Sequence, residues 1–163
     1  MFREMRRIKQ VLSKEDSVKV LENGTSGVLA VHGDDGYPYS VPLSYVYQEE
    51  KVFFHCAKTG HKVDAITSNE KVSFCVIDKD QIVPEEYTTY FRSVIVFGKA
   101  HIISDPVEKR HAIEKIAERY SPMQEEGRLK VIDNQFDQVC LIELDIEHMS
   151  GKEAIELVRA KEK

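Results

Sequence analysis

The chain has 163 residues, of which 42% are hydrophobic and 31% are charged, a balance typical of one globular domain with its own core. The net charge of −5, from 28 acidic and 23 basic side chains, argues against a general nucleic-acid-binding protein, which needs a basic face. No apolar run approaches the roughly 20 residues of a membrane-spanning helix, so we expect neither nucleic acid nor a membrane as a partner.

The chain opens with a basic arm that leads into a helix. The arm, MFREMRRIKQ, lacks the apolar stretch of a signal peptide, and we expect it to be solvated. Ser13 can cap a helix over residues 13–23, and Asn23-Gly24 ends that helix. We expect it to cover one opening of the structure that the strands build.

Two strands follow this helix. Residues 27–33 form a short apolar strand, and Asp34-Asp35-Gly36 is a strong turn signal. Residues 37–48 alternate clearly as a second strand. Because Pro42 cannot donate to a sheet ladder, we expect this strand to be irregular, or at a sheet edge, near its middle.

The next stretch, KVFFHCAKTGHKVDAI, is the most informative part of the chain. Residues 51–57 are rich in aromatic and β-favouring residues and predict a strand. The chain then turns at Thr59-Gly60, and a short helical pattern begins at His61 and Lys62. The start of a helix leaves backbone N–H groups free, so these residues predict an anion site, most simply for a phosphate.

The second half of the chain predicts further strands and one clear helix. We expect strands at residues 71–77 and 91–104, with a bulge or bend at Gly98, and a surface loop at residues 78–90. Asp105-Pro106 starts a helix well. The expected buried stripe of that helix is Ile113, Ile116, Ala117 and Tyr120.

The C-terminal part is less uniform. Residues 123–135 are ambiguous, with a helical turn indicated around residues 129–132. Residues 138–149 alternate as the last strand. Ser150, with Glu153 at the third helical position, resembles a capping box, so we expect a final helix over residues 150–160.

These elements predict a mainly β fold in one domain, residues 1–163, with a barrel over residues 27–148. About six strands with short turns do not alternate strictly with the helices. Such an order disfavours a doubly wound parallel sheet and favours a mostly antiparallel barrel with flanking helices.

Several kinds of site are disfavoured. Cys56, Cys75 and Cys140 are widely spaced and form no CxxC pair, which is typical of free thiols in a reducing compartment, so we expect the cytoplasm. His55 and Cys56 are adjacent and would point to opposite faces of a strand, so we expect no metal. A nucleophilic Cys56 would need a base folded nearby. Nucleophile-elbow, Walker A and GxGxxG motifs are absent.

The order YSVPLSYVY, FHCAKTGHK, KVSFCVI and RSVIVFGKA, continuing to SGKEAIELV, resembles the pyridoxamine 5′-phosphate oxidase-like flavoproteins. Within them it is most similar to the branch related to nitroimidazole-resistance (Nim) proteins. The resemblance covers nearly the whole chain. It implies a Greek-key-like split β-barrel that forms a homodimer and holds FMN at the subunit interface.

The resemblance also implies which residues contact FMN. Those of the turn and helix start, Thr59, His61 and Lys62, would lie at the phosphate. The isoalloxazine ring would lie along Val41, Pro42, Leu43, Ser44, His55, Cys56 and Ala57. Arg92 and Ser93 would reach it from the other subunit.

The chain departs from the true pyridoxamine phosphate oxidases. They carry an arginine where this chain has Tyr39, and their C-terminal substrate-binding segment contains a tryptophan, a residue that this chain lacks. The expectation is therefore an FMN-dependent oxidoreductase acting on a small molecule, with reduced nicotinamide as electron donor and His55 as proton donor. The Nim-like resemblance suggests nitro-group reduction. The alternatives are a non-catalytic FMN carrier or sensor, pyridoxamine phosphate oxidase-type activity, and a heme-binding split barrel.

Overall fold

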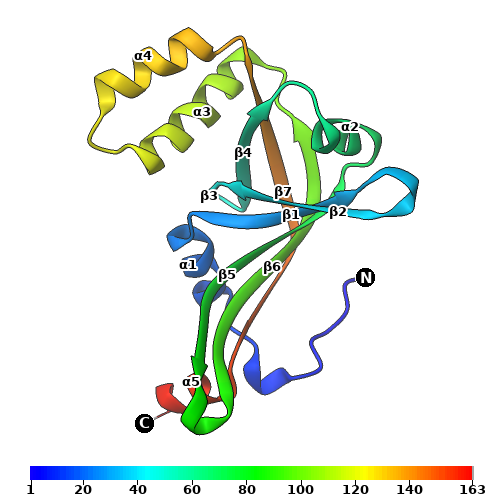
Figure 1. Cartoon of the computed structure of the whole chain (residues 1–163), viewed down its shortest axis with the longest axis vertical. Helices are drawn as coiled ribbons and strands as arrows, with labels where there is room; N and C mark the ends of the chain where they lie inside the picture. Colours follow the sequence, from blue (N-terminus) through cyan, green and yellow to red (C-terminus); the bar gives the residue numbers. More distant parts are fainter. Residues whose placement is uncertain (163) are drawn as a thin grey trace.

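Seven antiparallel strands form one sheet whose two edges belong to the same stretch of chain (Figure 1). The computed structural model describes residues 1–162. The strands run in the order β2-β1-β5-β6-β7-β4-β3. Their bounds are β1 Ser26–His32, β2 Pro38–Ser44, β3 Val46–Gln48, β4 Lys51–Ala57, β5 Lys71–Val83, β6 Thr88–Ile102 and β7 Val139–Glu153. Because β2 and β3 are separated by Tyr45 alone, the sheet curls into a split barrel, as predicted.

Tyr45 marks the break in the predicted strand 37–48. Before it, β2 pairs with β1; after it, β3 pairs with β4. The hydroxyl of Tyr120 accepts the N–H of Tyr45 at 2.9 Å, and its one proton is shared between the carbonyls of Tyr45, at 2.8 Å, and Thr25. These bonds replace ladder bonds that a continuous strand would make. Both halves are edge strands, which agrees with the prediction made from Pro42.

The barrel interior is closed by three aromatic rings. Tyr45, Phe54 and Phe74 are each fully buried, and Phe74 packs edge-on against both of the others at 5.0 Å between centroids. The Tyr45 hydroxyl donates to the carbonyl of Leu21 at 2.7 Å, which ties the N-terminal helix to the core. Edge-to-face contacts of this kind add to the stabilisation from burying the ring area.

Residues 1–162 contain five α-helices: α1 Lys14–Asn23, α2 His61–Ser68, α3 Pro106–Tyr120, α4 Glu125–Gln135 and α5 Ile155–Lys161. Of these, α5 lies at the far end of β5 and β6, away from the barrel (Figure 1). The predicted cap of α1 is confirmed, since the Ser13 hydroxyl accepts the Asp16 N–H at 3.0 Å. Short 3₁₀ turns occupy Ile8–Gln10, Asp34–Gly36 and Pro84–Glu86. Within residues 1–162, no helix combines the length and apolarity needed to cross a membrane.

The helical hairpin of α3 and α4 packs on the outer face of the barrel. Ala112 and Ile116 of α3 are buried against Phe53 of β4 and Leu141 of β7. The predicted buried stripe was therefore only partly right. Ile113 and Ala117 are half-buried, and Tyr120 is exposed along its ring while its hydroxyl bonds to the barrel.

The predicted surface loop at residues 78–90 was wrong. β5 continues to Val83 and β6 begins at Thr88, so the two strands form a long ribbon that projects beyond the barrel (Figure 1). A register shift between Ile77 and Lys79 marks where the ribbon leaves the barrel. Cross-strand pairing stabilises polar residues that carry little strand signal of their own.

Two further expectations for the C-terminal part were wrong. The final helix begins at Ile155, because Ser150–Glu153 pair with β6 and extend β7 beyond its predicted end. Glu153 is buried and ion-paired, so it does not cap a helix. Residues 125–135 form a complete helix instead of a single turn.

Gly98 provides the predicted irregularity in β6, where the register with β7 shifts between Phe97 and Gly98. A Cβ atom at Gly98 would lie 1.9 Å from the carbonyl oxygen of Asp145. The two backbones approach each other closely here, and only glycine fits.

We predict that Gly98→Ala lowers the free energy of unfolding by about 2 to 3 kcal/mol, because the backbone of β7 must move to admit the methyl group. The matched control is Gly127→Ala in α4, where a Cβ would meet no atom within 4 Å. Alanine in a helix interior should stabilise the protein by about 1 kcal/mol or less. Urea unfolding of both variants measures the difference, and equal midpoints would contradict the close approach at Gly98.

Candidate functional site

The candidate site follows β4 into the start of α2. β4 occupies Lys51–Ala57 and α2 begins at His61, both as predicted. Between them Gly60 has a φ of +131°, a conformation that side-chain-bearing residues rarely adopt, and no side chain caps the helix. Thr59 is exposed beside it. The Val63 N–H donates to the Gly60 carbonyl at 2.9 Å, which leaves the N–H groups of His61 and Lys62 available to an anion.

Two basic residues lie in this first turn. The imidazole of His61 stacks on Tyr39 with 4.1 Å between centroids, and its Nε2 is buried without a hydrogen-bond partner, 3.7 Å from the Asp34 carboxylate. Lys62 is half-buried and forms no ion pair within residues 1–162. Lys62 is thus the free cation of the turn, and the His61 ring is held against the β1–β2 hairpin.

A row of small outward-facing residues lies where β2 separates from β4. On β2 these are Pro42 and Ser44, and on β4 they are His55 and Ala57; Ser44 and His55 border the same cavity. All four of these outward residues are exposed. Of the predicted ring-contacting residues, Val41 and Leu43 point their side chains toward the barrel core.

Cys56 lies on the opposite face of β4 from His55. It pairs in register with Cys140 of β7, and its half-buried thiol packs against the barrel core. Burial raises the pKa of the Cys56 thiol to about 11, with a contribution from Cys140 that outweighs the opposing effect of Lys62. The thiol therefore stays protonated near neutral pH and is not an activated nucleophile.

Arg92 and Ser93 lie far from this site in the same chain. β7 pairs His55 with Leu141 and Ser93 with Lys152, a separation of roughly 35 Å along the strand. Arg92 is ion-paired with the buried Glu153 at 2.9 Å and with Asp78 at 3.1 Å. Only a second subunit could bring these two residues to β4 and α2.

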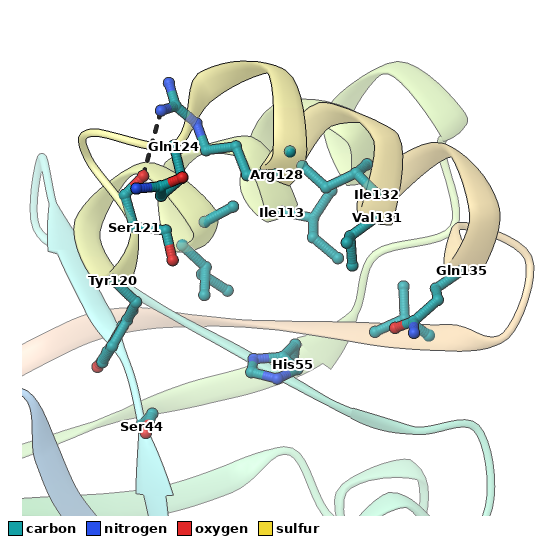
Figure 2. Close-up of a pocket in the computed structure, with 14 residues that line it drawn as sticks. Ser44, His55, Ile113, Tyr120, Ser121, Gln124, Arg128, Val131, Ile132 and Gln135 are labelled. Carbon is teal, nitrogen blue, oxygen red and sulfur yellow. Dashed lines mark hydrogen bonds between the residues drawn. The ribbon is translucent and has the colours of Figure 1, made fainter.

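A cavity of about 620 Å³ adjoins the outward row, beneath the α3–α4 hairpin (Figure 2). His55 and Ser44 form part of its floor, and Ile113, Ile132 and Val131 point toward them from the helices. Sequence reasoning missed this cavity because residues 123–135 were not recognised as a helix. The spacing of Gln124, Arg128, Val131 and Gln135 could have indicated one helical face.

A second polar cluster lies on the outer face of β6 and β7. His101, Glu143 and Asp145 place ligand-type atoms within 4.8 Å of one another. Lys51 already forms ion pairs with both carboxylates, at 3.4 Å for Asp145. A cation there would have to displace the lysine, so the cluster is better explained as a surface ion-pair network.

Comparisons with known proteins agree with this geometry. A family model described as pyridoxamine 5′-phosphate oxidase matches residues 13–153. No curated protein sequence gives a significant match.

Three similar solved structures cover most of the chain. A candidate 5-nitroimidazole antibiotic resistance protein from Bacteroides thetaiotaomicron has a TM-score of 0.72 and 21% identity over 88% of this chain and 86% of its own. An FAD-binding protein from Mesorhizobium loti has a TM-score of 0.67 and 25% identity over 89% of this chain and 97% of its own. An FAD and heme binding protein from Mycobacterium smegmatis has a TM-score of 0.73 and 19% identity over 90% of this chain and 73% of its own. These likenesses confirm the predicted split-barrel fold.

We predict that Cys56 reacts slowly with iodoacetamide at pH 8, because a thiol with a pKa near 11 is about 0.1% thiolate at that pH. Its rate should rise about tenfold per pH unit up to the pKa, as more thiolate forms. Mass spectrometry of the alkylated peptides, with glutathione as the reference thiol, measures this. Labelling of Cys56 faster than glutathione at pH 8 would show an activated thiol instead.

Proposed function

The chain belongs to the pyridoxamine 5′-phosphate oxidase family, and on that premise we propose that it is an FMN-binding homodimer that catalyses redox chemistry on a small molecule. The observation that carries the proposal is the continuity of the site. An open helix N-terminus with a free lysine lies at one end, and the outward row ending at His55 and a cavity lies at the other.

The phosphate end fits a phosphate monoester. The N-terminus of α2 is uncapped, Gly60 leaves space beside it, and Lys62 carries an unpaired positive charge. Backbone N–H groups at a helix N-terminus and an ammonium group both favour a dianion. The buried, unpartnered Nε2 of His61 adds a group that a polar ligand could satisfy.

The ring end fits a flat aromatic group. Pro42, Ser44 and Ala57 have small side chains, so a planar ligand can lie close to the backbone along the split between β2 and β4. When bound, FMN supplies hydride or single-electron transfer, and the chain supplies position and protons. His55 faces outward beside this row and is the residue suited to hold or deliver a proton there.

A second copy of the chain is proposed because an apolar row crosses the outer face of four strands. Val28 pairs with both Pro42 and Cys75, and Cys75 pairs with Ile95. Val28 and Ile95 are 39% and 38% exposed, and Ile77 beside them is 66% exposed. A contiguous apolar face of this kind is typical of a protein–protein interface. Its burial would also bring Arg92 and Ser93 of one subunit toward the other.

The reaction proposed is reduction of a small electron acceptor with reduced nicotinamide as donor. The likeness to the Bacteroides protein favours a nitro compound as acceptor. Vitamin B6 oxidation is not proposed, because two features of the true pyridoxamine phosphate oxidases are missing. Tyr39, which stacks on His61, stands where they carry an arginine, and the chain contains no tryptophan. Three free cysteines fit a reducing compartment, and we place the protein in the cytoplasm.

Two other functions remain distinguishable by experiment. A non-catalytic carrier would bind FMN and show no turnover. A heme-binding barrel is suggested by the Mycobacterium smegmatis protein, which binds both FAD and heme. The absorption spectrum of the purified protein separates flavin from heme, whose Soret band is intense.

Anaerobic mixing with reduced nicotinamides and nitroaromatics then separates enzyme from carrier. A protein that is colourless and ignores added FMN would overturn the proposal.

We predict that Lys62→Ala weakens FMN binding about 10- to 100-fold, because a hydrogen bond to a charged group contributes about 1.5 to 3 kcal/mol. Riboflavin, which lacks the phosphate, should lose little affinity. Flavin fluorescence titration measures both ligands, with Lys71→Ala on the exposed end of β5 as the matched control. An equal loss for FMN and riboflavin would place Lys62 away from the phosphate.

We predict that the double variant Val28→Lys, Ile95→Lys is a monomer, because four like charges would face one another across a two-fold interface. Light scattering coupled to size exclusion should then give a mass near 18.7 kDa instead of twice that value. Val107→Lys, at a valine that is 76% exposed on α3, is the control and should leave the dimer intact. A double variant that stays dimeric would place the interface elsewhere.

A further inference from the structure

The cavity beneath the α3–α4 hairpin has the size and shape of a small-molecule site. Its volume of about 620 Å³ lies inside the usual range of roughly 300 to 1,000 Å³ for such pockets. The strands form its floor and the two helices its roof (Figure 2). It is continuous with the outward row through Ser44 and His55.

The inner face of α4 is unpacked over most of its length. Gly127, Val131 and Gln135 line the cavity at a spacing of four residues, so they share one helix face. Val131 is 54% exposed, and a Cβ at Gly127 would meet no atom within 4 Å. Only Ile132 on this helix is buried. α4 therefore spans a space that it does not fill, and an apolar occupant would stabilise its position.

The polar groups that line the cavity favour an uncharged ligand. No carboxylate lines it among residues 1–162, so nothing there attracts a cation. Its one cation, Arg128, donates to the carbonyls of Ser121 and Pro122 at 3.3 and 3.1 Å, at the end of α3. Figure 2 shows the guanidinium turned toward Ser121 and away from His55. The arginine is thus committed to the hairpin turn and leaves the interior without a free charge.

Two polar side chains on the floor, Ser44 and His55, make no hydrogen bond within the described residues, and His55 is the larger of the two. The hydroxyl of Tyr120 is used by the backbone of Tyr45, whereas His55 is exposed and makes no side-chain hydrogen bond within the described residues. An imidazole can donate to an oxygen acceptor. Ile113 and Val131 stand opposite it and offer flat apolar contact to a ring (Figure 2).

We propose that this cavity binds an uncharged aromatic molecule that carries a hydrogen-bond-accepting oxygen, with the ring under Ile113 and Val131 and the oxygen at His55. Binding of this ligand does not depend on the proposed function. Its role as the redox substrate rests on that proposed function. Quinones and nitroaromatics share the required chemistry, and the binding experiment compares them directly.

Binding is tested on the full chain, with and without added FMN, by fluorescence of the uncharged probe N-phenyl-1-naphthylamine. We expect saturable binding that 1,4-naphthoquinone and nitrobenzene displace. Gly127→Phe and Val131→Phe, which fill the cavity, should each weaken probe binding at least about tenfold, the loss expected when an apolar pocket no longer admits the ring. Lys130→Phe, on the exposed face of the same helix, is the matched control and should bind as the wild type does.

The role of His55 is tested separately with His55→Leu. Losing one hydrogen bond of about 1 kcal/mol should weaken displacement by naphthoquinone and nitrobenzene about fivefold, while the probe, which has no oxygen, binds as before. Equal losses for probe and competitors would remove the assigned role of His55. The stronger of the two competitors identifies which class the pocket prefers.

Failure of this inference is distinguishable from failure of the proposed function. FMN binding without probe binding, or probe binding that survives both cavity-filling variants, overturns the pocket and leaves the flavoprotein intact. Probe binding that is lost in those variants, in a protein that takes up no FMN, supports the pocket and overturns the flavoprotein.

Discussion

The barrel depends on the hydrogen bonds that Tyr120 makes to the backbone of Tyr45. At Tyr45 the chain leaves one edge of the sheet and joins the other, so neither neighbouring strand can satisfy its N–H and C=O. A buried backbone pair without partners would cost several kcal/mol, on the order of 1 to 3 for each group. Because Tyr120 supplies both bonds, it also anchors the end of α3 to the split. The hairpin that roofs the cavity is held in place by the same interaction that lets the barrel open.

Successive side chains of β4 point to opposite faces of the sheet, so one set packs in the core and the other lies at the candidate site. Phe54 and Cys56 face the barrel interior, where burial keeps the thiol protonated. Phe53 and His55 face outward, the first under α3 and the second into the cavity. The strand then ends at Gly60, whose backbone conformation starts α2 with its N–H groups uncapped. One short segment therefore contributes to the core, the cavity and the candidate anion site.

The far end of the molecule is held by charges. Glu153 is buried between Arg92 and Lys161, and this network fixes the base of the β5–β6 ribbon against the end of β7. Removing both cations would leave the buried Glu153 carboxylate unpaired, which is far more destabilising than loss of a surface ion pair. The apolar row beside the ribbon is exposed in a single chain, and it is the surface on which we propose that a second copy binds.

The sequence by itself determined the elements whose signals are local: helix 13–23 with its serine cap, strand 51–57, the glycine turn and the start of α2. It also indicated the edge position of Pro42 and the irregularity at Gly98, since each follows from the chemistry of one residue. Only the tertiary structure decided the ribbon at residues 78–90 and the extension of β7 through Ser150–Glu153. Polar residues form strands there because β6 pairs with β5 over the ribbon and with β7 over Ser150–Glu153. At Ser150–Glu153, helix capping and strand pairing compete for the same backbone groups. The cavity likewise arises from packing, because α4 acquires an inner face only when Tyr120 fixes α3 over β4.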